Sequence, residues 1–166
     1  MARLHAEPPP DHDFPSLEQY LVTDVEPRVR RRLRQFGAGI PRRCAEAGLD
    51  ALEQRQMPGT AVLLHGDLYR ENVPVGCCGP VFLDPLPLVG AAVFDSASFV
   101  VYFALADDPV PRLREAGEAS AIAVSVLLPW CLTLCLDGLL YYREVRDSRE
   151  QRMVEVMTAL IAEASP

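Results

Sequence analysis

A stretch in the middle of the chain, residues 62–95, constrains the fold more than any other part. An apolar run leads directly into His65-Gly-Asp67, and Asn72 follows Asp67 by five residues. Two further apolar runs flank a Gly-Cys-Cys-Gly sequence, and Asp84 follows the second run. This pattern predicts two short strands joined by a tight turn. Such a hairpin would hold Asp67, Asn72 and Asp84 at neighbouring strand ends.

One acid, one amide and a second acid form a set that suits phosphoryl transfer. An aspartate in such a site accepts the proton of an attacking hydroxyl, while other side-chain oxygens hold the magnesium that bridges the phosphates. The pattern makes Asp67 the candidate catalytic residue and Asn72 and Asp84 the candidate metal ligands. The plainer alternative for Asp67 is a capping aspartate in a turn after a strand.

The same stretch resembles the catalytic signature of the aminoglycoside phosphotransferase family. The resemblance lies in H-G-D-L-x-x-x-N at residues 65–72, L-D-P at residues 83–85, and the following Gly90 and Asp95. Residues 82–95 are most similar to the streptomycin 6-kinase and hydroxyurea phosphotransferase branch. The Asp-to-Asn spacing also matches the catalytic loop of protein kinases.

The resemblance implies an α+β, mostly α fold that corresponds to the C-terminal lobe of a protein kinase, with a small β-hairpin at the site. It covers residues 14–163 and implies ATP as the phosphoryl donor and Mg²⁺ as the cofactor. The acceptor would be an alcohol group on a small molecule, aminoglycoside-like or another hydroxyl-bearing metabolite.

The resemblance also implies a role for each site residue. Asp67 would hold the acceptor hydroxyl and take its proton, and Asn72 and Asp84 would bind the metal. His65 would anchor the loop through a hydrogen bond to backbone. Asp95 would brace the catalytic loop, although a simple helix N-cap remains an alternative for it.

Two positions depart from the family pattern. Tyr69 stands where the family commonly has histidine. Pro74 interrupts the first predicted hairpin strand, residues 73–75, and proline cannot donate a ladder hydrogen bond. That strand, which pairs with residues 81–83, is therefore expected at an edge or a bulge.

The N-terminal lobe of the family is expected to be absent. That lobe covers the nucleotide and supplies a phosphate-binding loop and a lysine, whereas all 16 basic residues here are arginine. Only 64 residues precede His65, and their pattern is mostly helical. We therefore expect either a homo-oligomer or a partner that supplies the missing lobe. The alternative to an enzyme is an inactive kinase-like scaffold or binding module in secondary metabolism.

Proline, glycine and apolar periodicity predict the flanking elements. Two helices are predicted before the site, at residues 17–36, with a second start at Pro27, and at residues 41–57, and a strand is predicted at residues 60–64. After the site, one helix is predicted from Asp95 or Ser96 to residues 107–109. Another segment starts at Pro111, and a last helix is predicted at residues 149–162. Residues 119–136 carry no formal charge, which reaches the lower edge of a membrane span. Pro129 and the flanking acids favour a buried central helix, kinked at Pro129, with Trp130 in the core and a break at Gly138.

The function of two sets of charged residues, a run of arginines and a set of acids, has more than one interpretation. Five arginines lie between residues 28 and 34, and they form either an anion-binding patch or, as we favour, a solvated helix face. Acids on the helical part would attract a cationic aminoglycoside. The candidates are Asp107, Asp108, Asp137 and Glu144.

Composition bounds the remaining possibilities. The net charge of −7 argues against nucleic-acid binding, and no signal peptide is seen, so a cytoplasmic protein without a membrane anchor is expected. The five cysteines lack zinc-site spacing, and the adjacent Cys77 and Cys78 could be redox-sensitive. Residues 1–13 are expected to form a disordered proline-rich lead, in which His5 and His12 are solvated rather than metal-bound.

Overall fold

The structure is a computed structural model that describes residues 13–164 together with His5, Pro9 and Asp11. It is a helical body with two small antiparallel sheets, which confirms the expected mostly helical α+β composition. The helices are α1 (Leu17–Tyr20), α2 (Glu26–Phe36), α3 (Arg42–Gln54), α4 (Val93–Tyr102), α5 (Pro109–Ser120), α6 (Val124–Glu144) and α7 (Arg149–Glu163). The strands are β1 (Ala61–Leu64), β2 (Val75–Gly76), β3 (Gly79–Pro80) and β4 (Leu88–Ala91).

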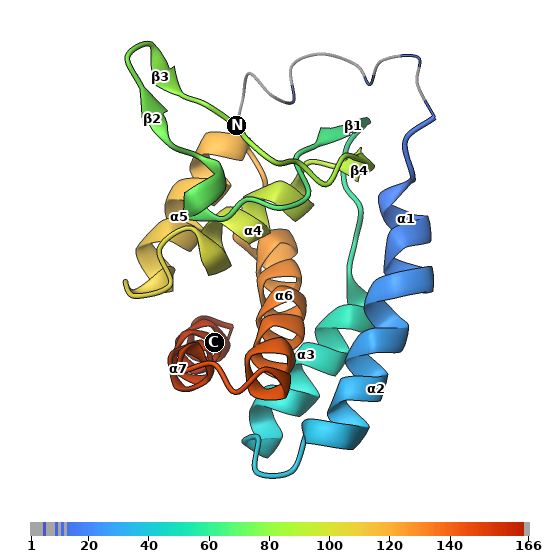
Figure 1. Cartoon of the computed structure of the whole chain (residues 1–166), viewed down its shortest axis with the longest axis vertical. Helices are drawn as coiled ribbons and strands as arrows, with labels where there is room; N and C mark the ends of the chain where they lie inside the picture. Colours follow the sequence, from blue (N-terminus) through green and yellow to red (C-terminus); the bar gives the residue numbers. More distant parts are fainter. Residues whose placement is uncertain (1–4, 6–8, 10, 12, 165–166) are drawn as a thin grey trace.

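Helix α6 is the centre of the body, and α2, α3, α4, α5 and α7 all pack against it (Figure 1). Its sequence is apolar on every face, and fourteen of its residues are buried. By length and mean hydropathy, 1.7 over its most apolar window, α6 alone among the described helices could cross a membrane. Because 72% of that window is buried inside the fold, α6 has the character of a core helix.

The first helical segment is almost continuous from Leu17 to Phe36. A π-helical turn, Leu21–Val25, joins α1 to α2, and Pro27 lies in the first turn of α2. Proline is tolerated there because the backbone N–H of a first-turn residue has no intrahelical acceptor. The predicted second helix start at Pro27 is therefore confirmed.

The principal sheet differs from the one predicted. β1 pairs with β4 in antiparallel register, with Val62 opposite Gly90, although no strand was predicted at residues 88–91. Gly90 is required because a Cβ there would lie 2.4 Å from Cβ of Leu17. This close approach seats α1 directly on the sheet.

The predicted hairpin exists, but its strands are shorter than expected. β2 and β3 have two residues each, and Cys77 and Cys78 form the turn between them. The Val81 N–H donates to the Pro74 carbonyl (2.9 Å), so the pairing continues past the strand ends. Pro74 therefore serves only as an acceptor, consistent with its position in a two-stranded ribbon that pairs with no other strand among the described residues.

Three helix boundaries also differ from the sequence prediction. α4 begins at Val93, so Asp95 lies inside its first turn, and the interpretation of Asp95 or Ser96 as N-cap is wrong. α5 begins at Pro109 rather than Pro111, capped by the Asp108 carboxylate. α6 continues through Gly138 to Glu144. Most of the predicted lead, including His12, lies outside the described residues. His5 is described and lies part-buried against Asp95, so the prediction that it is solvated is wrong.

Candidate active site

The loop after β1 is held in a shape that only glycine permits at its second residue. Leu64 is buried in the core, and the chain turns sharply at Gly66, which has a φ of 76°. A Cβ on Gly66 would lie 2.1 Å from the Leu86 carbonyl oxygen. This turn directs Asp67 out of the core and into an open cleft.

The side chain of Asp95, in α4, fixes the start of this loop. Its side chain is fully buried, and its carboxylate accepts the backbone N–H groups of His65 (2.8 Å) and Gly66 (2.9 Å). A third contact comes from the His5 ring, whose Nε2 lies 2.9 Å from Asp95 Oδ2. Asp95 therefore holds the start of the loop, and the role that the resemblance implies for it, as the brace of a catalytic loop, stays a prediction.

His65 links the loop to the segment that carries Asp84. Its ring is buried, and Nε2 lies 2.9 Å from the carbonyl oxygen of Leu83. The Leu86 N–H donates to the His65 carbonyl at 2.8 Å. The side chain therefore makes the backbone contact expected of an anchor rather than facing the cleft.

Asp67 and Asn72 are in direct contact. Asn72 Nδ2 donates to the Asp67 backbone carbonyl (2.9 Å) and to its carboxylate (3.1 Å). Burial raises the pKa of Asp67 and the nearby Asp84 adds to the rise, while the hydrogen bond from Asn72 opposes it. A carboxylate with a raised pKa is better matched to accepting a proton near neutral pH.

Asp84 completes the group from the far leg of the hairpin. The Leu83 N–H donates to the Asn72 carbonyl (2.8 Å), which fixes the two legs side by side. Asp84 has a φ of 51°, a left-handed conformation that Asp tolerates better than most residues. Asp67, Asn72 and Asp84 all line one cleft of about 540 Å³, and we name this group the loop wall.

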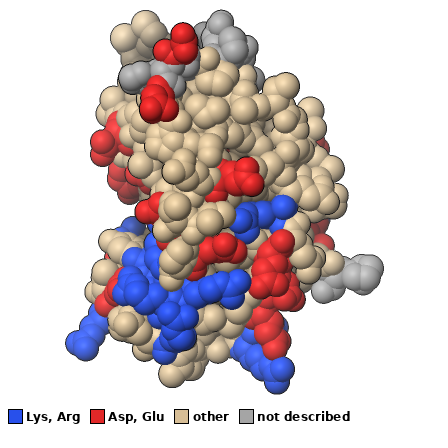
Figure 2. All heavy atoms as spheres, turned by 90° about the vertical axis from the view of Figure 1, so that its right-hand side faces the viewer, with Lys and Arg blue, Asp and Glu red and all other residues tan. Residues whose placement is uncertain are grey.

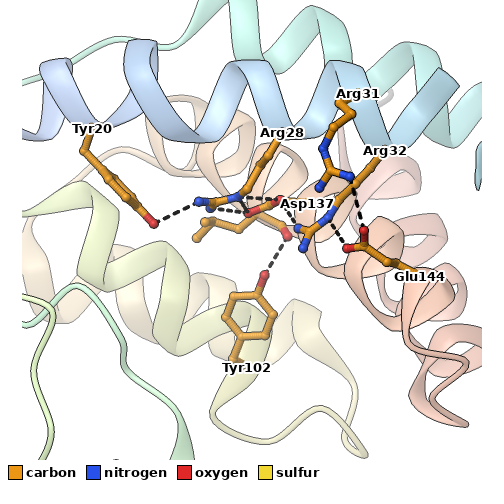
Figure 3. A network of polar contacts seen from close by, with 8 residues as sticks. Tyr20, Arg28, Arg31, Arg32, Tyr102, Asp137 and Glu144 are labelled. Carbon is orange, nitrogen blue, oxygen red and sulfur yellow. Dashed lines mark hydrogen bonds and ion pairs between the residues drawn. The ribbon is translucent and has the colours of Figure 1, made fainter. Parts of the chain in front are cut away.

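The opposite side of the cleft is formed by α2 and α6. Asp137 of α6 accepts three hydrogen bonds from Arg28 and one from Arg32, with distances of 2.6–3.2 Å (Figure 3). We name Arg28, Arg32 and Asp137 the helical wall. Burial lowers the pKa of Arg28, but the hydrogen bonds and charge of Asp137 outweigh this effect and raise it.

The arginine run of α2 therefore has two environments. Arg28 and Arg32 face the cleft and are paired there, so the favoured interpretation of the run as a solvated face is wrong for these two residues. Arg30 and Arg31 are half-exposed and pair with Glu53 and Glu144. Figure 2 shows the molecule from the side on which α1 and α2 lie, and arginine and acidic side chains are interleaved over the lower half of this view.

Tyrosines line the cleft between the two walls. Tyr69, at the position where the family commonly has histidine, stacks on Tyr102 with ring centroids 4.7 Å apart. Tyr102 in turn donates to the Leu134 carbonyl at 2.7 Å. Arg149 lies over the Tyr142 ring at 4.5 Å, and both side chains line the cleft. The cleft therefore offers flat rings and paired charges to a ligand.

The structure separates the acids proposed to attract a cation. Asp137 lines the cleft but is paired with two arginines, and Glu144 is paired with Arg31 and Arg32. Asp107 and Asp108 do not line it. The sequence does not single out the tyrosines as site residues. For Arg28 and Arg32 the sequence signal is their helical spacing on one face, within the run that has an anion-binding patch as the less favoured interpretation.

The donor set on the loop wall fits a hard divalent cation. Both hydrogen bonds of the Asn72 amide use Nδ2, and no residue in the described part of the chain donates to its Oδ1. The Asp84 side chain is exposed toward the cleft. Mg²⁺ takes oxygen ligands and is commonly held by one or two protein side chains together with phosphates and water. Asn72 and Asp84 would hold it here.

Comparison with known proteins identifies the fold but no family. No family model matches the sequence, and no curated protein matches it. A solved structure that does match is the crystal structure of a "putative fructosamine-3-kinase" from Thermobifida fusca YX-ER1. The match has a TM-score of 0.54 and 20% sequence identity, and it covers 89% of this chain and 51% of that chain. The chain thus spans about half the length of the protein it resembles. It has a kinase-like fold, compatible with a kinase-like C-terminal lobe.

Proposed function

We propose that this chain is the acceptor-binding and catalytic lobe of a small-molecule phosphotransferase, with an alcohol as the acceptor. The observation that supports this proposal best is the convergence of Asp67, Asn72 and Asp84 on one cleft. Asp67 is clasped by Asn72, while Asp84 remains free of protein partners in the described part of the chain. The kinase-like fold supports the same reaction class.

In this proposal each residue has a defined task. Asp67 accepts the proton of the acceptor hydroxyl as the oxygen attacks phosphorus. Asn72 holds the Asp67 carboxylate in position through Nδ2. Asp84 and Asn72 Oδ1 would provide oxygen ligands for Mg²⁺, which when bound would neutralise phosphate charge. The phosphoryl donor would be ATP.

The acceptor must be compatible with the helical wall. Asp137 is paired with Arg28 and Arg32, so its charge is compensated and it offers little attraction to an ammonium group. This pairing weighs against a polycationic aminoglycoside as the preferred acceptor. The resemblance implies either an aminoglycoside-like acceptor or another hydroxyl-bearing metabolite. Of these two, a hydroxyl-bearing metabolite with less positive charge is favoured.

A binding module without catalysis is the second candidate. The observation in its favour is the exposure of apolar side chains on the hairpin, with Val75 84% and Val81 47% exposed. Such exposure marks surfaces that other proteins cover. Calorimetric titration with Mg²⁺ and ATP separates the two functions, because only the phosphotransferase binds the nucleotide.

The decisive test of the proposed function is transfer of the γ-phosphoryl group of ATP to a panel of polyhydroxylated small molecules. The chain is assayed alone and together with any protein that co-purifies with it from its source. Transfer that is lost in Asp67→Asn and retained in Asp50→Asn, a matched change on the exposed face of α3, supports the proposal. Equal transfer by Asp67→Asn and the unaltered chain contradicts it.

A further inference from the structure

Two adjacent thiols stand at the tip of the hairpin. Cys77 and Cys78 are the two turn residues between β2 and β3, both are exposed, and their sulfurs lie 3.6 Å apart. The remaining cysteines of the chain, Cys44, Cys131 and Cys135, are buried. Burial raises the pKa of the Cys131 and Cys135 thiols, which makes them poor ligands and poor nucleophiles. Thiol chemistry is therefore concentrated at the tip.

Strain disfavours a disulfide between these neighbours. Consecutive Cα atoms lie about 3.8 Å apart across a trans peptide, whereas disulfides normally join Cα atoms roughly 4.4–6.8 Å apart. A bond between Cys77 and Cys78 would therefore be strained and readily reduced. The dithiol is the form that the local geometry favours.

The separation of the sulfurs instead suits joint coordination of a metal ion. Zinc binds thiolate sulfur at about 2.3 Å with tetrahedral angles, which places two ligand sulfurs about 3.8 Å apart. The sulfurs of Cys77 and Cys78, 3.6 Å apart, nearly match this distance without any change in the turn. Soft thiolate ligands select zinc over the hard cations that the loop wall would bind.

The pair supplies only half of a closed tetrahedral site. No group of three or more His, Cys, Asp or Glu side chains in the described part of the chain could hold a metal ion. A closed four-ligand site would therefore need two further ligands from outside the described residues. The hairpin projects away from the helical body, so its tip is open to a second molecule (Figure 1).

Exposed apolar side chains on the same ribbon favour a protein partner at this tip. Val75 is 84% exposed, and Val81 and Leu83 are each 47% exposed. These side chains flank the dithiol along the same ribbon. Clustered exposed apolar residues mark association surfaces, and a two-fold axis brings identical surfaces together. A second copy of the chain would bring both apolar contacts and the two missing thiols.

We propose that two copies of this chain share one zinc ion through the four thiolates of Cys77 and Cys78 from each copy. The ion would lie on the two-fold axis at the hairpin tips. Binding would replace four S–H protons by one Zn²⁺, so affinity would rise with pH. The proposal is independent of the phosphotransferase function, because it uses neither Asp67, Asn72 nor Asp84.

The test uses the full chain, reduced and stripped of metal, then titrated with Zn²⁺ alone. We expect a change from monomer to dimer in sedimentation velocity and one zinc per two chains by elemental analysis. Cys77→Ser and Cys78→Ser should each abolish both zinc retention and dimer formation. Cys44→Ala, which removes a buried thiol and keeps the pair, should retain both, with circular dichroism as the check on its folding.

Three results would overturn the proposal. Retention of zinc by Cys77→Ser at the level of the unaltered chain would place the ion elsewhere. One zinc per chain on a monomer would show that the second copy contributes no ligand. A dimer that forms equally well without zinc and in both serine variants would show that apolar contact alone joins the copies. Titration with Cd²⁺ gives an optical check, since thiolate coordination produces a charge-transfer absorption.

Discussion

The two walls of the cleft use similar residues in different ways. On the helical wall, the Asp137 carboxylate accepts hydrogen bonds from both Arg28 and Arg32. On the loop wall, Asp67 has only a neutral amide as its partner, and Asp84 faces the cleft without one in the described part of the chain. A carboxylate matched by two cations serves to join α2 to α6. A carboxylate without a cation remains available for a ligand or a proton.

The largest expected effect is a difference in catalytic activity between variants of the two walls. Asp67→Asn keeps the shape of the side chain but removes its capacity to accept a proton, so we expect kcat/KM for phosphoryl transfer to fall about 10²–10⁴-fold. Asp137→Asn should change kcat/KM far less in the fraction that remains folded. A comparable loss in both variants, at equal folded fraction, would contradict a functional difference between the walls.

For stability the order of the two walls is reversed, because a change on the helical wall is expected to have the larger effect. Asp137→Asn leaves the partly buried Arg28 without its carboxylate partner, while Arg32 keeps Glu144, and should lower the free energy of unfolding by about 3 kcal/mol. Urea denaturation provides the measurement. Glu53→Gln, which breaks the exposed pair with Arg30, is the control and should change stability by less than about 0.5 kcal/mol.

Two glycines test how tightly the loop wall is fixed. Both Gly66 and Gly59 have positive φ, but only at Gly66 would a Cβ collide with backbone, the Leu86 carbonyl. Gly59→Ala should therefore cost about 1 kcal/mol from its conformation alone, and Gly66→Ala about 2–3 kcal/mol. Equal costs in thermal unfolding would show that the loop at Gly66 can move away from Leu86.

The smallest effect concerns pH. Because the folded-state pKa of Asp67 is raised above its ordinary value of 3.8, its contribution to stability is present below that value. The contribution is lost as pH rises through the raised pKa. Asp67→Asn should therefore be slightly more stable than the unaltered chain at pH 7, with the difference disappearing in acid. Lower stability of Asp67→Asn at pH 7 in urea denaturation would contradict this sign.

Local signals predicted much of the architecture. Proline and glycine marked the start of α2 and the end of α3 within a few residues, and apolar periodicity identified α7. The order of Asp67, Asn72 and Asp84 along the chain indicated that they would meet, because a hairpin brings its two ends together. The structure places all three at one cleft.

The features that the sequence did not reveal depend on distant contacts. β4 follows a Pro-x-Pro sequence and contains Gly90, which indicates a loop until the opposing strand β1 is considered. The sequence pattern predicts a helix break at Gly138, but this glycine allows close packing inside α6, since a Cβ there would lie 2.7 Å from the Tyr102 hydroxyl. Arg28 and Asp137 are 109 residues apart, so no local pattern could pair them.

The central claim is that the loop wall, and not the helical wall, binds a divalent ion beside Asp67. Mn²⁺ substitutes for Mg²⁺ and broadens the NMR signals of nearby amides, so the measurement needs no acceptor and no turnover. We predict selective broadening at Asp67, Asn72 and Asp84 that is lost in Asp84→Asn and retained in the Cys77→Ser background. Broadening that is centred on Asp137, or that persists unchanged in Asp84→Asn, would contradict the account.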